Sequence, residues 1–204
     1  MCNLSVEMTR KFTNYKIYLY SDNHFLDHLK FDDVNYIDFF DDNLDKRYWN
    51  IPKFKTYSLQ EEPFIHIDFD LHVLPHFKIG NTDIICEKIR SIDKSENATR
   101  HCHDAQYAIC SGIMGTSTNK GLDYFKHLYE HAKEECVIGK WETVNLSDLF
   151  SLEECYTYNY AIANNFTVSY PEMWTFQHYA GGNKEERFSF AVKQALKNYR
   201  MADR

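Results

Sequence analysis

The residues best suited to chemistry are two carboxylates that stand two positions apart, Asp68 and Asp70. They end the run 64–70, Phe-Ile-His-Ile-Asp-Phe-Asp, which is the clearest β-type pattern in the chain. Side chains two positions apart in a strand share one face, so His66, Asp68 and Asp70 are expected to point the same way. Carboxylates placed side by side repel each other unless a cation lies between them, and Mn²⁺ or Mg²⁺ prefers such oxygen ligands. The pattern indicates a divalent-metal site, with a solvated acidic pair that caps nearby backbone N–H groups as the alternative.

A third candidate ligand, His178, lies far along the chain in the pattern His178-x-x-Gly181-x-x-Lys184. This pattern resembles the C-terminal motif of the family of glycogenin and bacterial lipopolysaccharide galactosyltransferases. In that family the histidine completes the metal site begun by an Asp-x-Asp pair, the glycine lets backbone approach the nucleotide diphosphate, and the lysine contacts it. Imidazole, glycine and an ammonium group suit these tasks. The resemblance therefore implies a Mn²⁺ or Mg²⁺ cofactor held by Asp68, Asp70 and His178, with Gly181 and Lys184 binding the donor.

Between these motifs, the run 110–114 (Cys-Ser-Gly-Ile-Met) resembles the family's Asn-(Ala/Ser)-Gly-Val-Met strand, which lies beside the donor and acceptor sugars. Cysteine stands first in this run, where that family usually has asparagine. The resemblance therefore assigns only Ser111 and Gly112 to the donor site, together with Asp68. The run 15–70 also resembles a family of largely uncharacterised bacterial proteins built on the same glycosyltransferase plan.

Glu154 has two interpretations. It and Glu153 fall where related enzymes place an acidic or amide residue near the donor sugar, which would give Glu154 a catalytic role beside Asp70. Glu154 is also the third residue after Ser151, and Ser-x-x-Glu is a capping-box pattern that begins a helix. The capping role is the favoured interpretation, with the catalytic role as its alternative.

These residues need a framework that brings them together, and the sequence alternates between strand-like and helix-like segments. The expected strands cover 16–20, 34–40, 64–70, 108–114, 167–170 and 174–178. The expected helices cover 5–12, 51–59, 121–136, a segment that starts at 151, and 184–199, while 83–92 fits either type. Such alternation favours an α/β fold with a mostly parallel mixed sheet flanked by helices. Lys53 is expected on a solvated helix face, with a phosphate contact as the alternative.

The length of 204 residues suits a single domain that spans 1–204. The resemblance implies that this domain has the GT-A fold, the Rossmann-like plan of nucleotide-diphospho-sugar transferases. Enzymes of this plan normally begin with a strand whose end holds the nucleotide base. Here the first expected strand begins only at residue 16, after a helical segment. The opening strand is therefore expected to be lacking.

Composition excludes several classes of protein. Hydrophobic residues make up 44% of the chain and aromatic residues 16%, which is too much for a disordered segment. The net charge of −7 argues against nucleic-acid binding by phosphate neutralisation. No apolar stretch approaches the roughly 20 residues of a membrane span, and residues 1–11 lack the apolar run of a signal peptide. With six scattered cysteines and no CxxC pair, we expect a cytoplasmic protein with reduced thiols.

The expected function is that of a metal-dependent glycosyltransferase of the hexosyltransferase type, which moves a sugar from a nucleotide-diphosphate donor to an unknown acceptor. Two departures from the family favour an alternative. The opening strand is lacking, and Glu185-Glu186 replaces the Pro-Trp that often follows the final lysine. The alternative is a catalytically inactive GT-A-like protein with a binding or assembly role.

Overall fold

The computed structural model describes residues 2–40, 43–92, 106–144, 148, 150–179, 186, 187 and 189. The α-helices are α1 (Cys2–Phe12), α2 (Ile51–Ser58), α3 (Asn119–Glu135) and α5 (Tyr156–Ala163), the π-helix is η2 (Ser151–Cys155), and the 3₁₀ helix is η3 (Met173–Thr175). The strands are β1 (Tyr18–Ser21), β2 (Asp33–Tyr36), β3 (Phe64–Ile67), β4 (Leu71–Val73), β5 (Ile84–Ser91), β6 (Tyr107–Thr116), β7 (Val168–Ser169) and β8 (Phe176–His178).

Three sheets organise the described chain. The central sheet has the strand order β3-β6-β5-β7, while β1 and β2 form a parallel pair and β4 and β8 an antiparallel pair. In the central sheet β6 runs antiparallel to both β3 and β5, and β7 runs parallel to β5. The predicted mixed α/β architecture is confirmed, but the prediction of a mostly parallel sheet is wrong for this central sheet. The reason is that β6, the central strand of this sheet, pairs antiparallel with both of its neighbours, β3 and β5.

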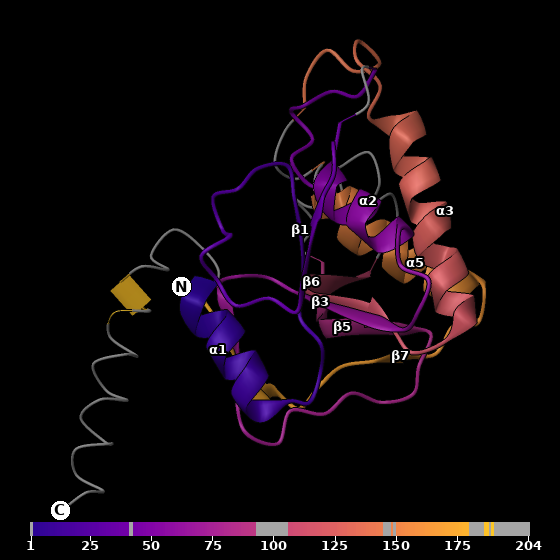
Figure 1. Cartoon of the computed structure of the whole chain (residues 1–204). Helices are drawn as coiled ribbons and strands as arrows, with labels where there is room; N and C mark the ends of the chain where they lie inside the picture. The colour runs from indigo at the N-terminus through magenta and orange to yellow at the C-terminus, as the bar shows by residue number, and fades with distance from the viewer. Residues whose placement is uncertain are drawn as a thin grey trace, which may run out of the picture.

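The central sheet separates two hydrophobic cores. Helices α2, α3 and α5 lie together on one face (Figure 1), where Phe54, Phe125 and Met114 belong to the larger core. On the other face Ile113 packs with Leu71 in a smaller core that the β4–β8 pair covers. Neighbouring residues of a strand point to opposite faces, so β6 contributes to both cores.

Helix α1 packs against β4, the strand that follows the acidic pair. The hydroxyl of Ser5 donates a hydrogen bond to the carbonyl of Leu71 at 2.7 Å. The helix predicted for 5–12 is confirmed and starts earlier, at Cys2. Strand β1 follows it but pairs with β2, and no described strand ahead of β3 joins the central sheet.

Helix α3 confirms the helix predicted for 121–136. Its apolar residues recur at helical spacing, and Leu122, Phe125 and Leu128 are buried as that spacing requires. The hydroxyl of Thr118 caps the first turn by accepting a hydrogen bond from the N–H of Gly121 at 3.1 Å.

Several boundaries differ from the prediction. The run 64–70 is a strand only through Ile67, the ambiguous segment 83–92 is strand β5, and 174–178 divides between η3 and β8. Of the helix predicted for 184–199, the structure describes only residues 186, 187 and 189, which are helical.

The described cysteines include four free thiols and one disulfide-bonded residue. Cys2, Cys86, Cys110 and Cys136 are free thiols, as predicted. Cys155 is disulfide-bonded, so the prediction of reduced thiols throughout is wrong at that position. In the parts of the chain that the structure describes, no helix combines the length and the apolar character that crossing a bilayer requires.

Candidate metal centre

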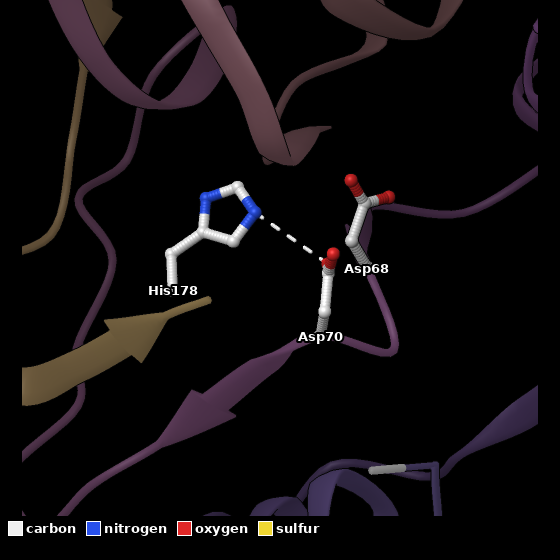
Figure 2. Close-up of side chains that lie close together, drawn as sticks. All are labelled: Asp68, Asp70 and His178. Atoms are coloured by element: carbon white, nitrogen blue, oxygen red, sulfur yellow. Dashed lines mark ion pairs between the residues drawn. The ribbon is translucent and has the colours of Figure 1, made fainter. Parts of the chain in front are cut away.

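Asp68 and Asp70 lie in a tight turn between β3 and β4. The N–H of Leu71 donates to the carbonyl of Asp68 at 2.9 Å, which closes the turn. The N–H of Asp68 donates to the carbonyl of Gly112 at 3.0 Å, which ties the turn to β6. The predicted shared strand face is therefore wrong in its geometry, because β3 ends at Ile67. The turn nevertheless presents both carboxylates to the same side (Figure 2).

His178 reaches this turn from β8. The antiparallel register of β4 and β8 places His178 opposite Leu71, and the N–H of Tyr179 donates to the carbonyl of Asp70 at 2.9 Å. The imidazole Nε2 lies 3.5 Å from Oδ1 of Asp70 (Figure 2). One ligand atom from each of Asp68, Asp70 and His178 lies within 4.8 Å of the others. The structure thus brings together the three residues that the sequence suggested as metal ligands.

The donor set of this cluster fits a hard divalent cation. Two carboxylates and one imidazole are ligands that Mn²⁺ accepts, and Mg²⁺ takes the carboxylates readily. The three side chains are partly exposed, 31% for Asp68, 21% for Asp70 and 18% for His178. A cation held here would therefore be reachable by a substrate. Three protein ligands leave coordination positions for oxygens of that substrate.

Asp68 is held in its ionised form by two neighbours. Nε2 of His66 lies 2.9 Å and Nζ of Lys53 lies 3.3 Å from its Oδ1. Burial alone would raise the pKa of Asp68, but the hydrogen bond from His66 and the charge of Lys53 outweigh burial. Together they hold the pKa of Asp68 well below its ordinary value.

His178 is held in its charged form. Burial alone would lower its pKa, but hydrogen bonds to Asp70 and Glu87 outweigh burial and raise the pKa to about 9. The imidazolium therefore supplies positive charge to the acidic turn when no metal is bound. A metal ion must compete with that proton, because imidazole coordinates only in its neutral form.

Glu87 of β5 is a site residue that the sequence did not reveal. Its Oε2 lies 2.8 Å from Nδ1 of His178, and the residue is only 4% exposed. The sequence feature that could have revealed it is a charged residue directly after three apolar ones, Ile84, Ile85 and Cys86. The structure shows all three to be fully buried. A charge in such a run needs a partner, and this one lies far away in the sequence.

Lys53 lies inside the protein, so the favoured prediction of a solvated helix face is wrong. Its side chain is 15% exposed, and its Nζ lies 3.2 Å from Oε1 of Glu153 and 3.3 Å from the carbonyl oxygen of Ser111. The hydroxyl of Tyr57 donates to the same Glu153 oxygen at 3.2 Å. Lys53 and Tyr57 are four residues apart on α2 and so share the face that packs into the core.

Glu154 does not close a capping box, so that favoured prediction is also wrong. Phe150, ahead of Ser151, already has helical backbone angles, and the hydroxyl of Ser151 donates to the carbonyl of Asp148 at 3.0 Å. Ser151 therefore lies inside a helical segment and cannot cap its start.

The carboxylate of Glu154 instead points into the protein. A guanidinium nitrogen of Arg90 lies 2.9 Å from its Oε2, and the N–H of Ser111 donates to its Oε1 at 3.3 Å. Burial raises the pKa of Glu154 to about 7, against the opposing effect of Arg90. A carboxyl group that titrates near neutral pH is suited to accept or donate a proton in catalysis.

The segment Ser111–Gly112 of β6 lies between Asp68 and Glu154 and contacts both. The carbonyl of Ser111 faces Lys53, its N–H faces Glu154, and the carbonyl of Gly112 holds the N–H of Asp68. Both predicted residues of β6 therefore lie beside the cluster. The predicted donor-binding residues Gly181 and Lys184 lie outside the described residues.

Negative charge dominates this network. Its described members comprise five acidic side chains against three basic ones that carry charge, Lys53, Arg90 and the protonated His178. The carboxylates belong to Asp68, Asp70, Glu87, Glu153 and Glu154. Carboxylates in excess at a partly buried site favour the binding of a cation.

Comparisons with known proteins give one family and no named relative. A family model described as a family of unknown function (DUF6734) matches residues 4–105, half of the chain. This segment contains Asp68, Asp70 and Glu87 but not His178. No curated protein and no solved structure shows a significant match.

Proposed function

The chain belongs to this family of unknown function, and we propose that it is a metal-dependent glycosyltransferase of the hexosyltransferase type, with a nucleotide-diphosphate sugar as donor and an unknown acceptor. The proposal rests mainly on one observation: one ligand atom from each of Asp68, Asp70 and His178 lies within 4.8 Å of the other two. A turn and a strand that are far apart in the sequence supply these ligands, with Mn²⁺ or Mg²⁺ as the cofactor.

The three sequence motifs that resemble those of known glycosyltransferases meet at one place, which supports the proposal. The first motif supplies Asp68 and Asp70, the second supplies Gly112, and the third supplies His178. The carbonyl of Gly112 accepts the N–H of Asp68 at 3.0 Å, and its Cα carries no side chain where it faces His178. Short motifs matched by coincidence have no reason to converge.

The residues of the chain divide the chemistry among them. A cation bound by Asp68, Asp70 and His178 would supply Lewis-acid stabilisation of the leaving nucleoside diphosphate. His66 and Lys53 keep Asp68 ionised, and both contact its Oδ1. The carboxylate of Glu154, whose pKa is about 7, would accept the proton of the acceptor hydroxyl group.

One observation favours a second candidate, a GT-A-like protein that binds or assembles without transferring sugar. In the described chain, the central sheet takes no strand from the segment before Phe64, because β1 and β2 form a pair of their own. GT-A enzymes normally use an opening strand to hold the nucleotide base. Without such a strand, base recognition has to come from elsewhere or is absent.

Thermal denaturation with nucleotides separates the two candidates. If the protein is a transferase, UDP or GDP with Mn²⁺ raises its melting temperature, and the rise disappears in Asp70→Ala. The matched control Asp123→Ala, at an exposed position of α3, keeps the rise. A panel of nucleotide sugars then identifies the donor by Mn²⁺-dependent hydrolysis. The absence of a shift with every nucleotide contradicts the transferase proposal and favours the binding protein.

A further inference from the structure

Glu87 is the buried partner of His178 on the side away from the acidic turn. We propose that Glu87 is a positioning residue, which orients the imidazole of His178 so that Nε2 is presented to a divalent cation. This inference rests on the proposed function, because it assumes that Asp68, Asp70 and His178 bind metal. It adds a residue that neither the sequence motifs nor the family resemblance assigns.

The two ring nitrogens of His178 face two different carboxylates. Nδ1 lies 2.8 Å from Oε2 of Glu87, whereas Nε2 lies 3.5 Å from Oδ1 of Asp70. A ligating histidine commonly donates its other N–H to a carboxylate, which fixes both its tautomer and the ring orientation. Once a cation has displaced the proton of Nε2, the short contact to Glu87 keeps the remaining proton on Nδ1, so the lone pair of Nε2 faces the turn that carries Asp70.

An irregularity in the sheet aims Glu87 at His178. Cys86 pairs with Met114 and Lys88 pairs with Cys110, so β6 carries two additional residues opposite Glu87. Bulges of this kind redirect side chains and are frequent beside functional sites. Here the bulge lies in the part of β6 that also contacts the acidic turn through Gly112.

Gly112 leaves the space in which the two side chains meet. A Cβ atom at this position would lie 2.6 Å from Oε2 of Glu87, 2.6 Å from Cε1 of His178 and 2.8 Å from Nδ1 of His178. Any larger residue would therefore push Glu87 and His178 apart. This requirement gives Gly112 a structural role in the metal site, independent of any contact with a donor sugar.

The affinity for Mn²⁺ alone, measured by calorimetry and by electron paramagnetic resonance, tests the inference. We expect Glu87→Ala to weaken Mn²⁺ binding 10- to 100-fold, as is usual when the partner of a ligating histidine is removed. Glu87→Gln should weaken it less, because an amide oxygen still accepts the N–H of Nδ1. Asp83→Asn controls for a general loss of stability. Asp83 is a buried carboxylate too, but it accepts hydrogen bonds from Thr118 and Thr167, which lie outside the metal site.

A pair of glycine variants tests the same geometry without removing a polar group. Gly112→Ala should weaken Mn²⁺ binding as Glu87→Ala does. Gly80→Ala is its matched control, because a Cβ there meets only Ser169, at an ordinary distance of 3.4 Å. In long-range proton–nitrogen spectra of the Cd²⁺-loaded protein, His178 should show a metal-bound Nε2 and a protonated Nδ1. This signature should be lost in Glu87→Ala and in Gly112→Ala.

The outcomes distinguish this inference from the proposed function. Unchanged Mn²⁺ affinity and unchanged nitrogen signals in Glu87→Ala and Gly112→Ala overturn the role of Glu87 alone. A wild-type protein that binds no Mn²⁺ overturns both this role and the metal centre. The expected pattern of affinities in a protein that transfers no sugar supports the role of Glu87 and contradicts the transferase.

Discussion

Lys53 and Glu153 form an ion pair inside the protein, with Nζ 3.2 Å from Oε1. The side chain of Glu153 is only 2% exposed, and that of Lys53 is 15% exposed. The same ammonium group lies 3.3 Å from Oδ1 of Asp68. A single lysine thus connects the helical layer, through α2 and η2, to the turn that carries the candidate metal ligands.

Removal of this lysine should destabilise the fold strongly. We expect Lys53→Met to lower the free energy of unfolding by about 3 kcal/mol or more, because it leaves the charge of Glu153 buried without its cationic partner. Urea denaturation measures the change in the free energy of unfolding. Lys126→Met, at an exposed position of α3, is the control and should stay within about 0.5 kcal/mol of the wild type. Equal stabilities of the two variants would contradict the importance of the pair.

Glu154 should make the stability depend on pH in the weakly acidic range. Its pKa is raised to about 7 in the folded protein, from an ordinary value of 4.5. The folded state therefore still holds this proton at pH values where the unfolded state has lost it. The free energy of unfolding is highest below pH 4.5 and falls as the pH rises to about 7. Glu154→Gln cannot titrate and should gain stability relative to the wild type between pH 4 and pH 8, by up to about 3 kcal/mol. A pH-independent difference between the two proteins would exclude the raised pKa.

His178 should link metal binding to pH. Its pKa of about 9 lies above the ordinary 6.5. In the metal-free protein, its contribution to the free energy of unfolding is therefore fully present below pH 6.5 and is lost as the pH rises through 9. A metal ion must displace the proton, so Mn²⁺ affinity should rise over the same range. Calorimetry in two buffers with different ionisation enthalpies measures the released proton. Binding without proton release would contradict coordination through His178.

Mn²⁺ itself should stabilise the folded protein. At a concentration one hundred times the dissociation constant, we expect a gain of about 2.7 kcal/mol in the free energy of unfolding. EDTA should reverse the gain, and Asp68→Asn should show none of it. Asp123→Asn, on the exposed face of α3, should respond as the wild type does. A similar gain in Asp68→Asn would place the bound ion elsewhere.

Periodic patterns in the sequence predicted local elements well. Helix α3 was predicted because its apolar residues repeat at helical spacing, and β3 was predicted because its residues alternate. The direction of the strands was not predictable in the same way. The pattern of a single strand does not tell whether its neighbour runs parallel or antiparallel, and the pairing of β5 with β6 decides this.

The candidate ligands could be found because their residue types and motif spacing are informative. Their partners could not be found, because contacts such as Lys53 with Glu153 join residues with no local relation in the sequence. Glu154 shows the opposite error. Its spacing from Ser151 matched a capping motif, but the helix begins before Ser151, so the carboxylate was left free to bind Arg90.

The turn that carries Asp68 and Asp70 is held by main-chain hydrogen bonds to Leu71, Gly112 and Tyr179. Such bonds form whatever side chains stand at positions 68 and 70. A relative could therefore lose either acid during evolution and still inherit the same loop. Shared architecture within this lineage does not guarantee a shared function, and the identity of these two residues in each member is the better guide to whether it keeps the proposed metal centre.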